Sequence, residues 1–139
     1  MASLIFRNFP ADLLSGRISP AVDTFHVLLV RGYAPDAAHA RRSDVERFEV
    51  QATGYDKGGK PTPCSTRTAG DVTSLLFGDA QWTVAGRIAA TGGVLYKARG
   101  GAPSEDELVS YLDFGAEKIA SDSTFTVHFA DGIALHHGA

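Results

Sequence analysis

WTVAGRIAATGGVLYKAR, residues 82–99, is the stretch from which we predict the fold. Alternate positions of its first half are apolar or small, and its second half holds three consecutive large apolar residues, Val94, Leu95 and Tyr96. Such runs are typical of half-buried strands, and adjacent glycines accept the backbone angles of a tight hairpin turn. We therefore predict a central β-hairpin that turns at residues 91–93, with Trp82, the only tryptophan, in the core.

Shorter apolar runs on both sides of this stretch also predict strands. They span residues 22–31, 45–53, 72–77, 107–114, 124–129 and 133–135, with Asp131-Gly132 as a further hairpin signal. Residues 10–14 resemble a helical turn, which Gly16 would end, and the segment of residues 32–44 has room for one further helical turn. The pattern favours an all-β fold, a single-domain β-sandwich that is jelly-roll-like, with about eight short strands and little helix. The residues that we assign to its core are Trp82, Val84, Ile88, Val94, Tyr96, Phe125 and Val127.

Two of these runs differ in the environment that they predict. Residues 22–31, VDTFHVLLVR, are apolar on both faces, which fits a strand that is covered on both sides or lies at an interface. Residues 45–53 alternate, with Phe48, Val50 and Ala52 on one face, which predicts a strand with one solvated side. Residues 32–44 and 54–64 are interpreted as loops, because glycine and proline recur in them.

Length and charge exclude several classes of protein. The 139 residues suffice for one domain, 1–139, with an N-terminal arm of about residues 1–10 and a C-terminal tail of about residues 136–139. Thirteen basic against 16 acidic residues give a net charge of −3, which argues against direct binding to nucleic acid. No segment approaches the roughly 18 apolar residues of a membrane-spanning helix. The single cysteine, Cys64, excludes an internal disulfide. We therefore expect the protein to be made in a reducing cytoplasm.

Residues 54–60, GYDKGGK, match the first seven positions of a phosphate-binding P-loop. The next position requires serine or threonine to hold magnesium, and a helix that begins there to direct its amides at phosphate. This chain has Pro61 at that position, followed by Thr62 and Pro63, which discourages a helix. We interpret the segment as a glycine-rich turn and predict no bound nucleotide.

Other residues with catalytic or metal-binding chemistry do not form a recognisable set. His136 and His137 are neighbours, and side chains of neighbours on a strand point to opposite faces, so they seldom share one ion. No G-x-S-x-G elbow is present, and the carboxylates of Glu105, Asp106, Glu107 and Asp113 are interpreted as a solvated cluster. We therefore predict no enzymatic activity, no metal and no cofactor.

A set of anchors along the chain nevertheless resembles a known family. The anchors are Leu13-Leu14-x-Gly16-x-Ile18, Asp23-Thr24-x-x-Val27-x-Leu29, Tyr33-x-Pro35-Asp36, Glu49-Val50-x-x-Thr53-Gly54-Tyr55-x-x-Gly58-Gly59, Trp82, Gly93-Val94-Leu95-Tyr96-Lys97, Tyr111-Leu112-Asp113-Phe114-Gly115 and Asp131-Gly132-Ile133. Their order and spacing are similar to those of small virion structural proteins of tailed bacteriophages, and in particular resemble capsid cement or decoration proteins of podovirus-like phages.

The resemblance implies a function without a reaction. A cement protein is a β-sandwich or jelly roll on the outer surface of the virion capsid, where it joins neighbouring copies of the major capsid protein. The resemblance also leaves open a place in the tail, neck or fibre of the virion. A sugar-binding module on the same fold is the alternative from another class, because a fold alone does not define a function.

The apolar arm and the two-sided run suggest where such a protein would make contacts. Contiguous apolar surface usually marks an interface, so we expect a homo-oligomer, a dimer or trimer, that binds the major capsid protein. The interface residues that we predict are Leu4, Phe6, Phe9, His26, Leu28 and Val30.

Overall fold

The computed structural model of the chain describes residues 4–129 and 132–136. It is an all-β structure of antiparallel sheets with one helix, α1 (Asn8–Ser15). The strands are β1 (Leu4–Ile5), β2 (Phe25–Val30), β3 (Lys60–Thr62), β4 (Cys64–Ala69), β5 (Val72–Phe77), β6 (Ala80–Thr83), β7 (Arg87–Lys97), β8 (Leu108–Ser121), β9 (Thr124–Val127) and β10 (Ile133–His136). Three short 3-10 turns are η1 (Arg42–Asp44), η2 (Glu46–Phe48) and η3 (Pro103–Glu105).

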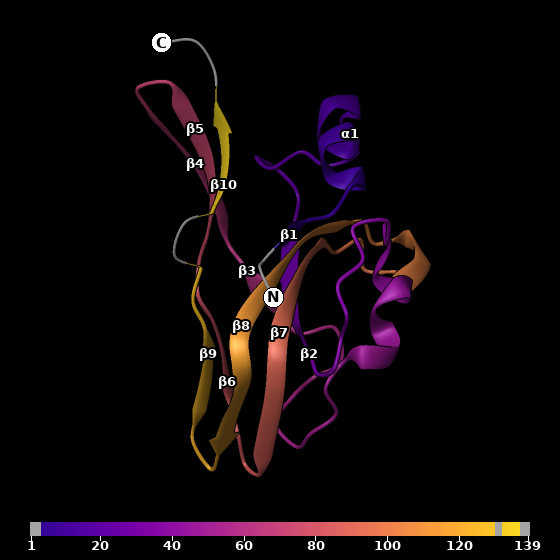
Figure 1. The fold of residues 1–139 in the computed structure, drawn as a ribbon, viewed down its shortest axis with the longest axis vertical. Helices are drawn as coiled ribbons and strands as arrows, with labels where there is room; N and C mark the ends of the chain where they lie inside the picture. The colour runs from indigo at the N-terminus through magenta and orange to yellow at the C-terminus, as the bar shows by residue number, and fades with distance from the viewer. Residues whose placement is uncertain (1–3, 130–131, 137–139) are drawn as a thin grey trace.

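The strands form two layers that pack face to face (Figure 1). One layer is a five-stranded sheet in the order β1-β8-β7-β2-β3. The other layer contains the sheet β10-β5-β4 and the pair β6-β9. Only two residues separate β5 from β6, and β10 pairs with β5 while β9 pairs with β6. The second layer is therefore nearly continuous. The predicted all-β sandwich is therefore confirmed at the level of its layers, whereas the jelly-roll connectivity stays a prediction.

The predicted central hairpin is wrong, because residues 91–93 do not turn: they lie inside β7, which runs without a break from Arg87 to Lys97. Trp82 of β6 lies opposite Phe125 of β9, and β7 pairs with β8 on one side and β2 on the other. Gly92 lies inside β7, next to an irregularity in its register with β8. A side chain at Gly92 would collide with the ring of Tyr111, so this glycine provides space for packing and does not form a turn.

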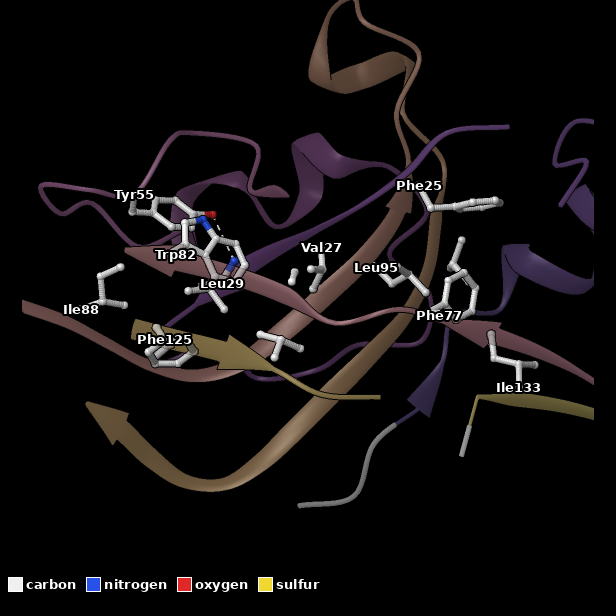
Figure 2. Close-up of a cluster of buried hydrophobic side chains, with 14 of the residues drawn as sticks. Phe25, Val27, Leu29, Tyr55, Phe77, Trp82, Ile88, Leu95, Phe125 and Ile133 are labelled. Carbon is white, nitrogen blue, oxygen red and sulfur yellow. Dashed lines mark hydrogen bonds between the residues drawn. The ribbon is translucent and has the colours of Figure 1, made fainter. Parts of the chain in front are cut away.

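The sandwich core lies between the two layers (Figure 2). Trp82, Phe125 and Phe77 reach it from the second layer, and Val27 and Ile88 reach it from the five-stranded sheet. All seven residues that we assigned to the core are buried. Two of the seven, Val94 and Tyr96, lie on the opposite face of the five-stranded sheet, in a second apolar cluster.

This second cluster explains why β2 is apolar on both faces. Leu28 and Val30 project into it, and the chain covers them with residues from other segments, such as Phe6, Tyr33 and Val45. Residues 45–53 do not form the strand that we predicted, although Val45 is buried in this cluster. They contain η2 and an irregular stretch that pairs with β2 only through a bridge between Val30 and Glu49.

The predicted N-terminal arm is also part of the packed fold. β1 pairs with β8 at Ser110 and Tyr111, the N–H of Phe6 donates to Val109 O, and the Phe6 ring is completely buried. The helix that follows is longer than the predicted turn, and it ends where we predicted, at Gly16, whose φ of +83° suits glycine. Among the described residues, no helix has the length and apolar character needed to cross a membrane.

The closing strand lies where we predicted it, but it does not form a hairpin with β9. β10 pairs with β5 and β9 pairs with β6, so both strands belong to the same layer but to different strand pairs. Asp131, half of the predicted hairpin signal, lies outside the described residues, as do His137 and the rest of the predicted tail after His136.

Candidate functional site: an apolar groove at the open edge of the sandwich

Most of the predicted interface is not available on the surface of the chain. Phe6, Phe9, Leu28 and Val30 are each at most 2% exposed, because they pack within the two apolar clusters. Of the six predicted residues only Leu4 and His26 are partly exposed. The prediction that these four residues form an interface is therefore wrong. The apolar residues on both faces of β2 are buried by other segments of the same chain.

A different surface offers contacts at the edge where the two layers meet. On one side β8 continues beyond the two residues that β1 covers, and on the other side β9 and β10 form the margin of the second layer. Between these margins lie two adjoining hollows of about 530 and 410 Å³, which share Leu112 and His128 in their lining. We call the two together the edge groove.

The edge groove is lined mainly by apolar side chains. Leu4, Leu112 and Phe129 contribute to the first hollow, and Phe114 to the second. Ile5 in the first hollow and Ile119 in the second are 45% and 51% exposed, which is high for large apolar residues of a folded chain. Exposed apolar residues that gather along one groove mark a contact surface more strongly than scattered ones do.

The backbone of β8 limits how a partner could use this groove. Asp113 lies opposite Gly92 and Lys118 opposite Ala90, so the residues between Asp113 and Lys118 bulge out of the ladder. Gly115 within this bulge has a φ of +79°, and its N–H donates to Asp113 Oδ1 over 2.8 Å. A bulge interrupts an exposed strand edge and protects it from edge-to-edge pairing. The groove therefore suits side-chain contacts more than an added long strand.

His128 and Asp79 form a close acid–base pair at the rim of the edge groove. His128 Nδ1 lies 2.7 Å from Asp79 Oδ1, and the side chains are 72% and 48% exposed. No described hydroxyl group hydrogen-bonds to His128, which a nucleophile activated by this pair would do. The pair is arranged as a solvated surface contact.

The P-loop-like segment is organised around a carboxylate of the chain itself. Glu49 Oε2 accepts hydrogen bonds of 2.6 Å from the Gly58 N–H and from the Tyr55 hydroxyl. The Tyr55 hydroxyl in turn accepts the Leu29 N–H over 3.0 Å, and burial together with the Glu49 charge raises the pKa of Tyr55. Pro61 lies in β3 and not at the start of a helix. The Gly58 amide, which a P-loop would direct at phosphate, is thus already occupied by Glu49.

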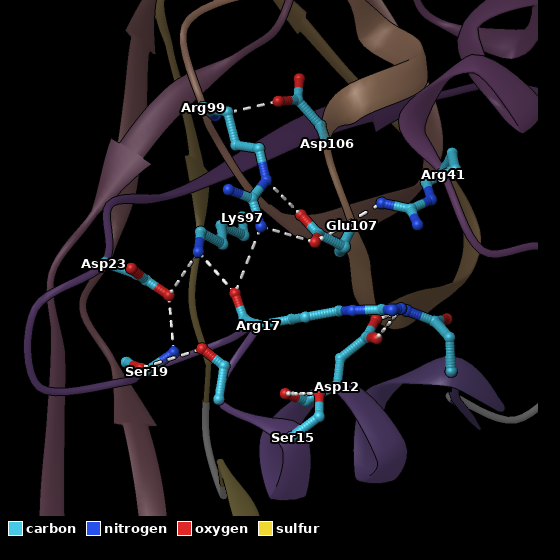
Figure 3. Close-up of polar contacts among 12 residues, drawn as sticks. Asp12, Ser15, Arg17, Ser19, Asp23, Arg41, Lys97, Arg99, Asp106 and Glu107 are labelled. Carbon is cyan, nitrogen blue, oxygen red and sulfur yellow. Dashed lines mark hydrogen bonds and ion pairs between the residues drawn. The ribbon is translucent and has the colours of Figure 1, made fainter.

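Asp106 and Glu107, which sequence analysis placed in a solvated cluster, are buried and paired with arginines (Figure 3). Arg99 donates to both carboxylate oxygens of Glu107 over 2.8 and 2.7 Å, and Arg41 Nη1 lies 3.4 Å from Glu107 Oε2. Arg42 Nε donates to Asp106 over 2.8 Å. Burial alone would raise the pKa of Glu107, but the Arg99 hydrogen bond and the nearby positive charges hold it below its usual value.

This network is structural in its geometry. A carboxylate that is held by two guanidinium groups stays ionised and is a poor proton acceptor, so Glu107 is unsuited to general acid–base work. The contacts join the loop between β7 and β8, which holds Arg99, Asp106 and Glu107, to Arg41 and Arg42 at the start of η1; Arg42 and Asp106 are 64 positions apart in the sequence.

His26, His39 and Cys64 do not converge on one site. His26 lies beside Tyr96, with ring centroids 5.9 Å apart, and burial lowers its pKa. His39 Nδ1 is 2.7 Å from the Tyr33 hydroxyl, and burial raises the pKa of the half-buried Cys64 thiol. Within residues 4–129 and 132–136, no three His, Cys, Asp or Glu side chains are placed to hold a metal ion.

Comparison with known proteins adds no relative of this chain. No family model, no curated protein and no solved structure matches it.

Proposed function

We propose that this protein is a structural component of a phage virion, a cement protein that binds the outer surface of the capsid through its edge groove. The edge groove carries the proposal, because it gathers exposed apolar side chains along an open margin of an otherwise closely packed sandwich. The anchors that resemble virion proteins support it from the sequence. No chemical reaction is part of the proposal.

The occupant that we propose for the edge groove is an apolar segment of the major capsid protein. Ile5 lines the first hollow and Ile119 lines the second, so a segment that occupies both hollows contacts both residues. Each such contact is weak by itself, but the symmetry of a shell repeats it many times, and an oligomer of the cement protein would gain avidity from this repetition.

The test is retention on purified capsids that lack the protein. Ile119→Asp places a charge in the groove at a half-exposed position, so the domain is expected to fold normally and to lose at least about tenfold in retention after sedimentation. Leu14→Asp is the matched control, because Leu14 is 89% exposed on α1 and does not line the groove. This control is expected to bind within about twofold of the original chain.

Three outcomes would contradict the proposal. If the original chain does not bind capsids but sediments with isolated tails or fibres, the tail alternative replaces it. If it binds glycans on a carbohydrate array and no part of the virion, the sugar-binding alternative does. If Leu14→Asp loses as much retention as Ile119→Asp, the protein binds capsids by another surface.

A further inference from the structure

Another hollow lies on a different part of the molecule, where β2 ends and β7 continues with β8 as its only strand neighbour among the described residues. Val30, the last residue of β2, pairs with Gly92, whereas β7 begins five residues earlier at Arg87. The segment of residues 47–51 runs beside the end of β2, with the Arg31 N–H donating to Phe48 O over 3.0 Å. A hollow of about 440 Å³ remains between this segment and the start of β7.

Three arginines from three different elements line this hollow, which we call the arginine hollow. They are Arg31 after β2, Arg47 in η2 and Arg87 at the start of β7. Arg31 Nε is held by Glu117 at 2.8 Å, which leaves its terminal amino groups without a described partner. Neither Arg47 nor Arg87 has an ion-pair partner among the described residues.

The rest of the lining gives the hollow a second, apolar character. The Arg47 guanidinium lies over the Phe48 ring, 4.9 Å from its centroid, and Val50 and Ala89 add aliphatic surface. Stacking of this kind orients the guanidinium and leaves its N–H groups directed outward. Glu49 also lines the hollow, but one of its carboxylate oxygens already accepts the Gly58 and Tyr55 hydrogen bonds.

The backbone on the two sides of the arginine hollow is not joined. Among the described residues, no main-chain hydrogen bond connects residues 87–91 of β7 with residues 47–51. The start of β7 therefore presents main-chain groups on the side from which β2 is missing. An extended chain in the hollow could use these groups while its side chains contact the arginines.

We infer that the arginine hollow binds an extended acidic peptide segment of a partner protein. Guanidinium groups match carboxylates in charge and in bidentate geometry, and the apolar lining suits the residues between two acidic side chains. The volume falls in the range of roughly 300 to 1,000 Å³ that is typical of ligand sites. This inference does not depend on the edge groove or on a place in a virion, because it uses other residues.

A nucleic acid fits this surface less well than an acidic peptide. Binding to a polyphosphate chain usually needs many Lys and Arg contacts spread over a basic face. This chain has a net charge of −3, and the three arginines of this surface surround one hollow of limited size. A few carboxylates saturate such a site.

The experiment measures the fluorescence anisotropy of a labelled hexapeptide in which glutamate and valine alternate. We expect saturable binding by the original chain, weaker binding as the ionic strength is raised to about 1 M, and little binding of a peptide with glutamine in place of glutamate. Arg87→Glu is expected to weaken binding at least about tenfold, because it reverses one of the three charges.

Arg67→Glu is the matched control, since it makes the same change of charge at an exposed position on β4, outside the hollow. It should leave the affinity within about twofold. Amide NMR signals of Gln51 and Ala89, which line the hollow, should shift on addition of the acidic peptide and stay unchanged in Arg87→Glu.

Four results would overturn the inference. The hollow does not bind acidic peptides if the glutamate peptide shows no saturable binding. Selectivity for carboxylates is absent if the glutamine peptide binds equally well. The site is misplaced if Arg67→Glu weakens binding as much as Arg87→Glu. The hollow is a nucleic-acid site instead if single-stranded oligothymidine binds more tightly than the peptide and if Arg87→Glu abolishes that binding.

Discussion

Trp82 shows how much of this fold depends on the packing of one side chain. It is completely buried beside Tyr55 and Phe125, whose ring centroids lie 5.7 and 6.3 Å from its own. Its Nε1–H has no hydrogen-bond partner among the described residues. Burial of apolar surface and ring contacts therefore hold it in place, and the indole nitrogen contributes no described bond.

We predict that Trp82→Ala lowers the free energy of unfolding by about 3 to 5 kcal/mol, as truncation of large buried aromatics does. Trp82→Phe should cost clearly less, because it keeps most of the ring and removes the unpartnered N–H. Chemical denaturation measures both, with Leu14→Ala at an exposed site as the control. Equal midpoints for Trp82→Ala and the original chain would show that the packing around Trp82 contributes little.

At the scale of elements, β2 is held in place from both faces and also by a loop. Its inner side chains enter the sandwich core and its outer ones the second cluster. The glycine-rich segment of residues 54–59 packs directly on its backbone, because Gly59 approaches the carbonyl of Val27 so closely that no side chain fits between them. Gly59 also has a φ of +79°, which only glycine adopts without strain.

Gly59→Ala is therefore expected to destabilise the protein by about 2 kcal/mol or more, since the loop must move away from β2 and the backbone is strained. Gly86→Ala is the control, because its added carbon would meet nothing nearer than Thr53 Cβ at 4.0 Å and its φ is not positive. Thermal unfolding monitored by circular dichroism distinguishes the two. Similar melting temperatures for both variants would be evidence against the close approach of the loop to β2.

At the scale of the whole molecule, the network around Glu107 couples its stability to pH. An exposed glutamate in the unfolded chain titrates near pH 4.3, at about its ordinary pKa. Arg99 and Arg41 hold the pKa of Glu107 below that value in the folded protein, in spite of its burial. The contribution of Glu107 to the free energy of unfolding is therefore complete at a pH above its pKa in the unfolded chain. It is lost as the pH falls through the lower pKa that Glu107 has in the folded protein.

We expect Glu107→Gln to lose roughly 2 kcal/mol of unfolding free energy at pH 7 and to lose less as the pH falls below about 4. Urea denaturation of both chains across this range measures the difference. Asp71→Asn, in the turn between β4 and β5 and without a described contact, should follow the original chain at every pH. If the free energies of unfolding of Glu107→Gln and the original chain differ by the same amount at every pH, the ion pairs do not lower the pKa of Glu107.

The edge groove and the arginine hollow could not be predicted from the sequence. Ile119 and Ile5 are 114 positions apart in numbering, and only the pairing of β1 with β8 and the position of β9 and β10 bring their surroundings together. Arg31, Arg47 and Arg87 likewise become neighbours only through the packing of the segment after β2. Surfaces of this kind have no local pattern, because their residues share a place in space and not a spacing in the chain.

Local sequence patterns were enough to locate several elements. The apolar run of residues 72–77 predicted β5, alternating apolar residues identified the core positions of β6, β7 and β9, and Gly16 marked the end of α1. Three features appeared only in the folded chain: β6 pairs with β9, Gly92 lies within a strand, and the chain covers both faces of β2. The period of apolar residues along the chain indicates which face of a strand or helix is buried. The strands that pair with that element, and the side chains that cover it, come from segments far away in the sequence, which the local pattern does not identify.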